Sequence, residues 1–213
     1  ADSTYEGWSE TVSMTISNVE LGTITDSTAI GTINDADSQP TITIDCTGCW
    51  SNEWDTATFC INLSNASYQT VSVDVNTSPA GTNQATAWTD YTSYSNTEDI
   101  TAWLTTKCIF VSTLQDSVDE YNETYEVALS NPVNGTLGSP SIRTATITDD
   151  DPLPSITIDN VVETEPNSQI IRINLSDVSE KDVSVDYVLQ DDSAVYDDDY
   201  TIWTNSSWIK NFS

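Results

Sequence analysis

The sequence contains no histidine and only 5 Lys and Arg residues, against 34 Asp and Glu residues, which gives a formal net charge of -29. Without histidine, neither a Ser-His nor a Cys-His catalytic pair can form, and we find no glycine-rich phosphate loop. Glycosidase chemistry needs one acid kept protonated in an apolar cleft, whereas the acids here crowd together in polar stretches. We therefore expect a protein that is not an enzyme.

The excess of negative charge also limits the partners of the chain. Nucleic acid and anionic membrane surfaces would repel it, so we expect no nucleic-acid partner. No apolar run approaches the length of a membrane span. Hard divalent cations are the natural counter-charge that remains.

Three consecutive aspartates stand in residues 144–159, which read TATITDDDPLPSITID. Two like charges about 4 Å apart repel by roughly 4 kcal/mol at an effective dielectric of 20. A packed fold therefore needs a cation at Asp149–Asp151, unless these side chains form a solvated surface. We expect the solvated alternative for Glu126 and Asp186, which alternate outward on predicted strands.

The chain repeats itself with an offset near 112 residues. Its front motifs ITID, INLS and VSVD begin at Ile42, Ile61 and Val71, and again at Ile156, Ile173 and Val183. Its back motif ETYEVALSN at Glu123 resembles ETVSMTISN at Glu10. The repeat predicts a complete domain over residues 41–151, the back half of a domain over 1–40 and the front half over 152–213. The chain is thus expected to begin and end in mid-domain.

Segments within the repeat alternate apolar and polar residues with period 2, as at Val71, Val73 and Val75. This period is typical of strands with one buried face, and we find no stretch of comparable length with helical spacing. About seven short strands in roughly 110 residues predict an all-β fold of antiparallel β-sandwiches.

The order ITID, Glu, INLS, VSVD, DYT, D-x-x-x-E-x-x-E-T, LSN and ATITDDD resembles the Calx-beta repeat of sodium–calcium exchangers and extracellular adhesive proteins. The resemblance covers essentially the whole chain, as one complete copy and two complementary partial copies. It implies tandem immunoglobulin-like sandwiches that bind calcium at one end, through acidic loops and the terminal aspartates.

The resemblance also implies the calcium ligands. Calcium suits carboxylates because it takes six to eight oxygen ligands in flexible geometry, whereas zinc favours His or Cys. The first partial repeat departs from the pattern, because Glu10 stands one residue late and Ala36 occupies the middle of its aspartate trio. In the complete repeat the ligands are Glu53, Asp90, Asp116, Glu120, Glu123, Asp149, Asp150 and Asp151, and in the partial repeats they are Asp2, Glu6, Asp35, Asp37, Glu165 and Asp199.

Four cysteines lie in the complete repeat. In a sandwich of this type the strands of Cys60 and Cys108 are neighbours, which permits a disulfide between them and leaves Cys46 and Cys49 to close a small loop. Four cysteines allow three pairings, and the sequence alone does not choose among them. A zinc site is the rival interpretation, weakened by the absence of histidine and of a second CxxC motif.

Sequons and disulfides together point to a secreted or cell-surface glycoprotein. Asn62 and Asn174 occupy the same repeat position and alternate outward, so they are candidates to carry sugar. The full set of candidate glycosylation sites is Asn62, Asn65, Asn76, Asn122, Asn134, Asn174, Asn205 and Asn211.

The tryptophans form either caps on the open ends of the sandwich core or contacts between domains, and capping is the commoner role. The residues concerned are Trp50, Trp54, Trp103, Trp203 and Trp208.

Three functions fit these features. The first is a structural module of an extracellular filament, in which copies of the chain join head to tail with calcium at the domain junctions. The joining is either covalent, within a longer tandem polypeptide, or non-covalent, by strand complementation. The second is the stalk of a calcium-dependent cell-surface adhesin, which would hold a domain that binds a carbohydrate or other surface ligand. The third, a calcium sensor, is disfavoured by the disulfides and sequons. For a head-to-tail junction, we expect Lys210 to match Lys107 and Asp2 to match Asp116.

Overall fold

The computed structural model describes residues 2–201 and 208–212, the last five by their backbone. It divides into two compact units. Unit 1 comprises Ala1–Leu114 and Glu123–Ile147, and unit 2 comprises Gln115–Asn122 and Thr148–Ser213. The described residues form strands and loops without any helix, so none of them provides a helix suited to crossing a membrane.

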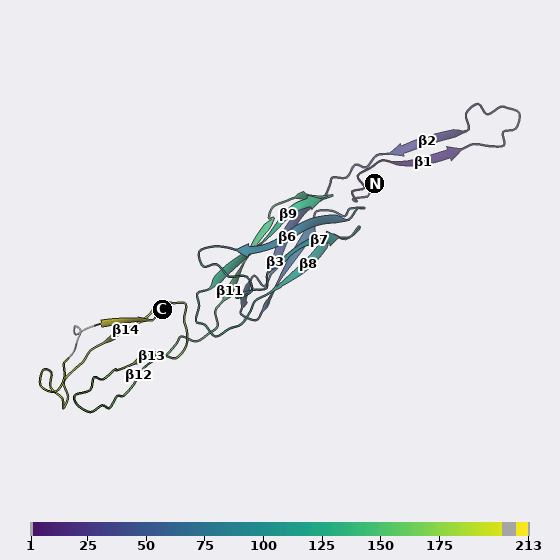
Figure 1. Cartoon of the computed structure of the whole chain (residues 1–213). Helices are drawn as coiled ribbons and strands as arrows, with labels where there is room; N and C mark the ends of the chain where they lie inside the picture. Colours follow the sequence, from purple (N-terminus) through teal and green to yellow (C-terminus); the bar gives the residue numbers. More distant parts are fainter. Residues whose placement is uncertain (1, 202–207, 213) are drawn as a thin grey trace. The chain divides into compact units, whose positions relative to one another are not determined.

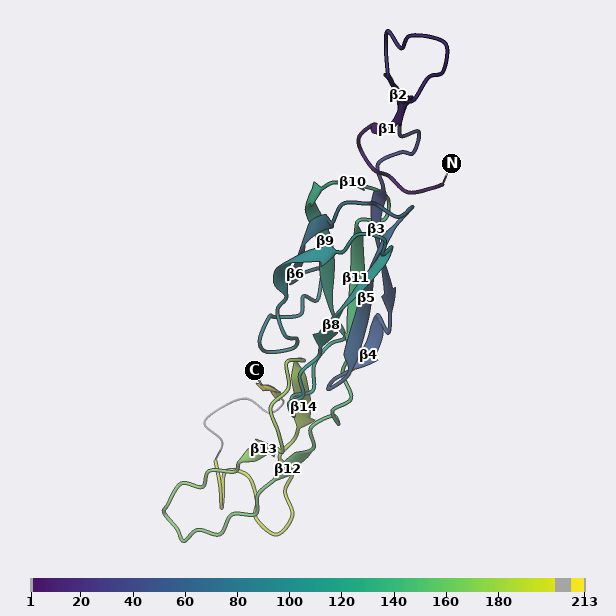
Figure 2. The ribbon, with the colours of Figure 1, turned by 90° about the vertical axis from the view of Figure 1, so that its right-hand side faces the viewer.

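A β-sandwich of two sheets makes up most of unit 1 (Figures 1 and 2). The four-stranded sheet has the order β10-β3-β5-β8, with bounds Thr136–Leu137, Thr41–Thr47, Thr56–Leu63 and Thr106–Ser112. The five-stranded sheet has the order β4-β11-β9-β6-β7, with bounds Trp50–Asn52, Ile142–Thr148, Glu123–Val133, Val71–Pro79 and Ser95–Ile100. The prediction of an all-β sandwich is confirmed.

The core of the sandwich follows the alternation in the sequence. Along β5 every second residue is buried, from Ala57 to Leu63, because successive side chains of a strand point to opposite faces. The rings of Phe59 in one sheet and Tyr125 in the other meet edge to face, with their centroids 6.2 Å apart. Tyr125 also stacks on Tyr91 at 4.4 Å. Both sheets therefore contribute aromatic side chains to a single core.

Two disulfides cross-link residues of the four-stranded sheet and of the turn that follows β3. Cys60 on β5 lies directly opposite Cys108 on β8, and the two residues are bonded with Cα atoms 4.0 Å apart. Cys46 and Cys49 are bonded across a short turn. This is the pairing that neighbouring strands of Cys60 and Cys108 permit, and it is one of the three that four cysteines allow.

The segments before and after the sandwich form two-stranded ribbons. These are β1–β2 (Glu10–Thr15 and Thr28–Ile33), β12–β13 (Ile156–Ile158 and Ile173–Leu175) and β14–β15 (Val183–Tyr187 and Trp208–Phe212). Each ribbon has the register of its counterpart in the sandwich. For example, Ile156 faces Leu175 as Ile42 faces Leu63, and Glu10 faces Ile33 as Glu123 faces Ile147.

The ribbons expose the apolar residues that the sandwich buries. Met14 on β1 is 65% exposed, whereas Val127, its counterpart on β9, is 0% exposed. Ile33 on β2 is 59% exposed, whereas its counterpart Ile147 is 4% exposed. Local pairing is therefore complete in the ribbon, but burial of its apolar face is not.

The register of β15 corrects one expectation. Val183 faces Phe212 as Val71 faces Ile100, so β15 takes the place of β7 beside β14, the counterpart of β6. Lys210 consequently matches Glu98 and not Lys107, because both lie two residues before the end of that pairing. The expected match was wrong because it relied on a lysine present in both segments, whereas the strand that each segment pairs with decides the match. Two halves joined end to end would thus lack a counterpart of β8.

The tryptophans of the complete repeat do not cap its core. Trp50, Trp54 and Trp103 are 79%, 80% and 59% exposed, which contradicts the commoner of the two expected roles. Trp103 instead meets Tyr68 edge to face with centroids 5.5 Å apart, and Tyr68 meets Trp8 in the same way at 5.1 Å. Trp203 lies outside the described residues, as does the side chain of Trp208.

Candidate metal centre

A first group of acids gathers in unit 1, in the loop before β1 and the segment after β2. One carboxylate oxygen from each of Asp2, Glu6 and Asp37 lies within 4.8 Å of the others. Asp2 is held in place because its carboxylate accepts the backbone N–H of Thr4 at 3.1 Å. All available ligand atoms are oxygens, the donor type that calcium prefers.

Asp35 orders the backbone around this group without belonging to it. Its Oδ2 accepts the backbone N–H groups of Glu6 and Gly7, and its Oδ1 accepts that of Asp37 at 2.9 Å. The backbone N–H groups of Gly7 and Asp37 are the main reason that the pKa of Asp35 is lowered. In contrast, the pKa of Glu6 is raised, first by partial desolvation and then by the negative charges of Asp2 and Asp35. Asp35 therefore favours its charged form, whereas the charges that act on Glu6 disfavour its own.

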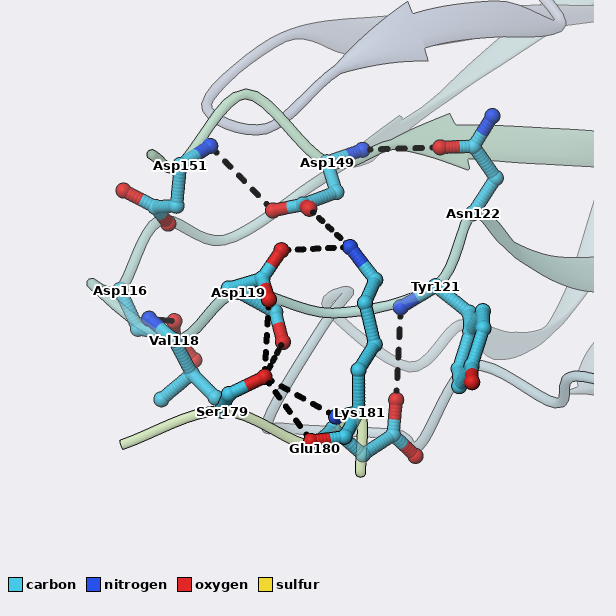
Figure 3. A network of polar contacts seen from close by, with 10 residues as sticks. All are labelled: Asp116, Val118, Asp119, Tyr121, Asn122, Asp149, Asp151, Ser179, Glu180 and Lys181. Carbon is cyan, nitrogen blue, oxygen red and sulfur yellow. Dashed lines mark hydrogen bonds and ion pairs between the residues drawn. The ribbon is translucent and has the colours of Figure 1, made fainter. Parts of the chain in front are cut away.

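A second group of acids lies in unit 2 and repeats this geometry (Figure 3). Asp151 N–H donates to Asp149 Oδ1 at 3.2 Å, as Asp37 N–H donates to Asp35. Val118 N–H donates to Asp116 Oδ1 at 2.7 Å, as Thr4 N–H donates to Asp2. The aspartate trio and the preceding acidic loop thus fold alike in both repeats.

Within this second group, Asp151 has the strongest physical need for a cation. Its Oδ2 is buried, and none of the described residues donates a hydrogen bond to it. Its pKa is raised, first by desolvation and then by the charges of Asp149 and Asp116, with smaller effects of Asp150 and Asp119. A buried, unpaired carboxylate oxygen among like charges is costly unless a metal ion or a proton satisfies it.

A lysine contributes to the second group, which the sequence analysis did not foresee. Lys181 Nζ lies 2.5 Å from Asp119 Oδ1 and 3.2 Å from Asp149 Oδ2. Its ammonium group is also 5.6 Å from the centre of the Tyr121 ring. The hydrogen bond from Lys181 is the main reason that the pKa of Asp119 is lowered, with the Ser179 hydroxyl second. The sequence does hint at such a role, because Lys181 is one of only 5 cationic residues in a chain with many acids.

Two further candidate ligands have structural roles in turns. Asp90 Oδ2 accepts the backbone N–H of Thr86, and Asp199 Oδ2 accepts that of Val195 at 2.9 Å. Each aspartate closes a turn ahead of a tyrosine, so at least one carboxylate oxygen is already occupied. Sequence comparison alone did not reveal this role, because a turn acceptor and a metal ligand are the same residue type.

The remaining candidates are spread over both units. Glu53 is buried and Glu123 is half-buried in unit 1, whereas Glu120 is half-buried, and Asp150 and Glu165 are exposed, in unit 2. The structure therefore brings together Asp2, Glu6 and Asp37 in unit 1, and it brings Asp116 near Asp149 and Asp151 in unit 2.

The candidate glycosylation sites differ in exposure and in hydrogen bonding. Asn76, Asn122 and Asn174 are exposed, although Asn76 accepts a hydrogen bond from Ser95 Oγ at 2.7 Å and Asn122 accepts one from Asp149 N–H at 3.3 Å. Asn62 is half-buried on β5 and accepts a hydrogen bond from Thr106 Oγ1 at 3.0 Å. Asn65 donates to Ser38 O, and Asn134 donates to Thr70 O at 2.8 Å. Asn205 and the side chain of Asn211 lie outside the described residues.

The donor sets of both groups fit calcium. They consist of carboxylate oxygens on loops, they contain no His or Cys, and one of them holds the buried unpaired oxygen of Asp151. Asp2, Glu6 and Asp37 would hold the ion in unit 1. Asp116, Asp149 and Asp151 are the residues that would hold it in unit 2.

Several known structures are similar to this chain. The chain is similar to the crystal structure of the apo-form Calx CBD1 domain, at 21% identity and a TM-score of 0.45, over 52% of this chain and 99% of that one. It is similar to CBD12 from CALX1.2 at 19% identity and a TM-score of 0.45, over 78% and 70% of the two chains. No curated protein matches significantly. The family model of the Calx-beta domain matches residues 35–151 and 157–205, so the chain belongs to the Calx-beta family.

Proposed function

We propose that this chain is a calcium-binding structural repeat of an extracellular glycoprotein filament. The observation that carries the calcium part is the buried Asp151 Oδ2, which lies among like charges and accepts no hydrogen bond from the described residues. A bound divalent cation supplies the missing partner and removes the repulsion. With a net charge of -29, the protein itself offers few cations to do so.

Calcium should stabilise the folded chain against unfolding. A ligand at 100 times its dissociation constant adds about 2.7 kcal/mol to the free energy of unfolding. We expect Asp151→Asn to lose much of this gain, and to be at least as stable as the wild type in chelator, because the substitution removes a repelled charge. The matched control is Asp186→Asn, which removes an exposed charge on β14.

Thermal melting of the full chain in calcium and in EGTA measures both effects. An equal calcium gain in the wild type and in Asp151→Asn would show that Asp151 is not a ligand. If EGTA leaves the melting temperature unchanged at low salt, the calcium function itself is wrong.

The two disulfides support an extracellular location, because such bonds persist in oxidising compartments. The exposed asparagines Asn76, Asn122 and Asn174 are suitable acceptors for sugar. Mass spectrometry of the protein from its natural source, before and after removal of N-linked glycans, would detect occupancy at these positions. Unmodified asparagine at all three sites would remove the glycoprotein part of the proposal.

The filament part rests on the exposed ribbons. In the sandwich, β9 pairs with β6 so that Leu129 faces Val75 and Val127 faces Thr77. The counterpart strands are β1 and β14, and the same register would place Ile16 opposite Tyr187 and Met14 opposite Leu189. A second copy of the chain can therefore add β1–β2 to β14–β15, giving the order β2-β1-β14-β15. This order reproduces β11-β9-β6-β7, which is four strands of the five-stranded sheet.

Such a contact is heterologous, and it propagates head to tail because each copy keeps one free ribbon at each end. Analytical ultracentrifugation over a range of concentrations should show oligomers of the wild-type chain. Met14→Asp, on the apolar face of β1, should reduce them to monomers, whereas the control Ser13→Asp, on the other face, should not. A wild-type chain that stays monomeric at high concentration would refute assembly between copies.

A further inference from the structure

The loop that precedes β1 and the loop that precedes β9 each form the same backbone contact with a turn that follows a later strand. In unit 1, Tyr5 bridges to Ser67 in parallel, and Tyr68 N–H donates to Tyr5 O at 2.9 Å. In unit 2, Asp119 bridges to Ser179 in parallel, and Glu180 N–H donates to Asp119 O at 3.0 Å. We call these contacts the first and the second clip.

The two clips also share their internal hydrogen bond. Gln69 N–H donates to Ser67 Oγ at 3.1 Å, and Lys181 N–H donates to Ser179 Oγ at 3.1 Å. Ser67 and Ser179 are the same position of the repeat, as are Gln69 and Lys181. Both clips join an acidic loop to the β5–β6 turn, or to its counterpart, of the repeat that follows in the sequence.

The side chains around the clips differ in charge. The first clip is aromatic, because Tyr5 stands at the loop position and the ring of Tyr68 meets Trp8 and Trp103. The second clip is ionic. Asp119 is 2% exposed at the loop position, and Lys181 reaches both this aspartate and Asp149.

The second clip therefore buries an acid that needs a positive partner, and a residue of the following repeat supplies it. Asp119 receives the ammonium group of Lys181 and the hydroxyl of Ser179, which donates to Asp119 Oδ2 at 2.8 Å (Figure 3). Removing one partner of a buried ion pair is costly, because the remaining charge is left buried without compensation. The first clip has no acid at the Asp119 position and an uncharged Gln69 at the Lys181 position.

We propose that Lys181 is a built-in cation that keeps the second clip closed without calcium, whereas the first clip depends on calcium to order its acidic loop. This proposal rests on the calcium function proposed above. In the second clip, Lys181 neutralises part of the acidic charge that a divalent cation would otherwise neutralise. In both clips the acidic loop contacts the turn of the next repeat. A lysine stabilises this contact in the second clip, and aromatic rings together with a bound ion stabilise it in the first.

Hydrogen–deuterium exchange of the full chain tests this proposal, because each clip is closed by backbone N–H groups. In EGTA, we expect the amides of Glu180 and Lys181 to stay protected in the wild type, while those of Tyr68 and Gln69 exchange faster than in calcium. Lys181→Gln, which installs the residue found in the first clip, should speed exchange at 180–181 at least about tenfold in EGTA. Calcium should reverse much of this change, and Lys181→Arg should behave as the wild type.

The matched control is Lys107→Gln, which loses the same charge from the Lys107–Glu98 ion pair on the sandwich. It should leave exchange at both clips unchanged, and the amides of β5 and β9 report that each variant remains folded. Unchanged exchange at 180–181 in the EGTA sample of Lys181→Gln would overturn the role of Lys181. If instead that variant is loosened and calcium slows exchange nowhere, the lysine contact stands and the calcium function falls.

Discussion

The apolar faces of β9 and β1 carry equivalent residues in opposite surroundings. Tyr125, Val127 and Leu129 on β9 are buried beneath the second sheet. Their counterparts are exposed, namely Val12 and Met14 on β1 and Ile16 directly after it. Yet each strand pairs with its neighbour in the same register. Strand pairing is thus set by short-range sequence, whereas burial needs a second layer of strands.

This difference predicts where the stability of the chain resides. The hydrophobic effect scales with the apolar area removed from water, and the ribbons remove little of it. The sandwich of residues 41–151 should therefore unfold as the cooperative unit of the monomer. The ribbons, which leave their apolar faces exposed, should contribute little to this stability.

The largest expected effect comes from truncating one core residue and its exposed counterpart. Phe59→Ala should lower the free energy of unfolding of the sandwich by about 3–5 kcal/mol, because it removes a buried ring and leaves a cavity. Ile171→Ala, at the same repeat position beside β13, should change it by less than about 0.5 kcal/mol in the monomer. Urea unfolding followed by tryptophan fluorescence measures both, and equal losses would contradict the comparison.

The next largest effect concerns the disulfides, which are present in the complete repeat alone among the described residues. Replacing Cys60 and Cys108 by alanine should cost about 2–4 kcal/mol, since their bond closes a loop with a sequence separation of 48. Replacing Cys46 and Cys49 should cost less, because their separation is only 3. The front half of the next repeat has Arg172 in place of Cys60, so reduction with dithiothreitol should leave its ribbons unaffected. Circular dichroism melts of the two double variants would show the reverse order if the model of loop closure were wrong.

The smallest expected effect is a dependence on pH at Asp74 of β6. Hydrogen bonds from the Thr97 hydroxyl and the Asn131 amide lower the pKa of Asp74. A lowered pKa in the folded state stabilises the fold above the ordinary aspartate pKa of about 3.9, and this gain is lost as the pH falls through the folded value.

Asp74→Asn should therefore reduce the difference in urea midpoint between pH 7 and pH 3 by a small amount. The arrangement is particular to the sandwich, because Asp74 faces Thr97, whereas its counterpart Asp186 on β14 faces Ile209. An unchanged difference in midpoint would show that these hydrogen bonds do not stabilise the charged form of Asp74.

The acidic loops could be predicted from the sequence, but the roles of single residues within them could not. The repeated aspartates predicted that Asp149 and Asp151 would gather with Asp116, since carboxylates so placed repel unless they are neutralised. Lys181 could not be predicted, because a lysine just before a strand has no spacing that marks it as the partner of a distant aspartate. Nor does the sequence show that Asp90 and Asp199 close turns.

The sequence by itself determined the all-β fold and the positions of the repeated strands, and it narrowed the cysteine pairings to three, because period-2 alternation and a repeat of near-constant length act locally. Only the tertiary structure decided which apolar faces are covered, that β15 takes the place of β7, and that Trp50, Trp54 and Trp103 lie on the surface. These features depend on contacts between segments far apart in the chain. Their free energy comes from area buried jointly and from charges brought together, and neither quantity is a property of one segment alone.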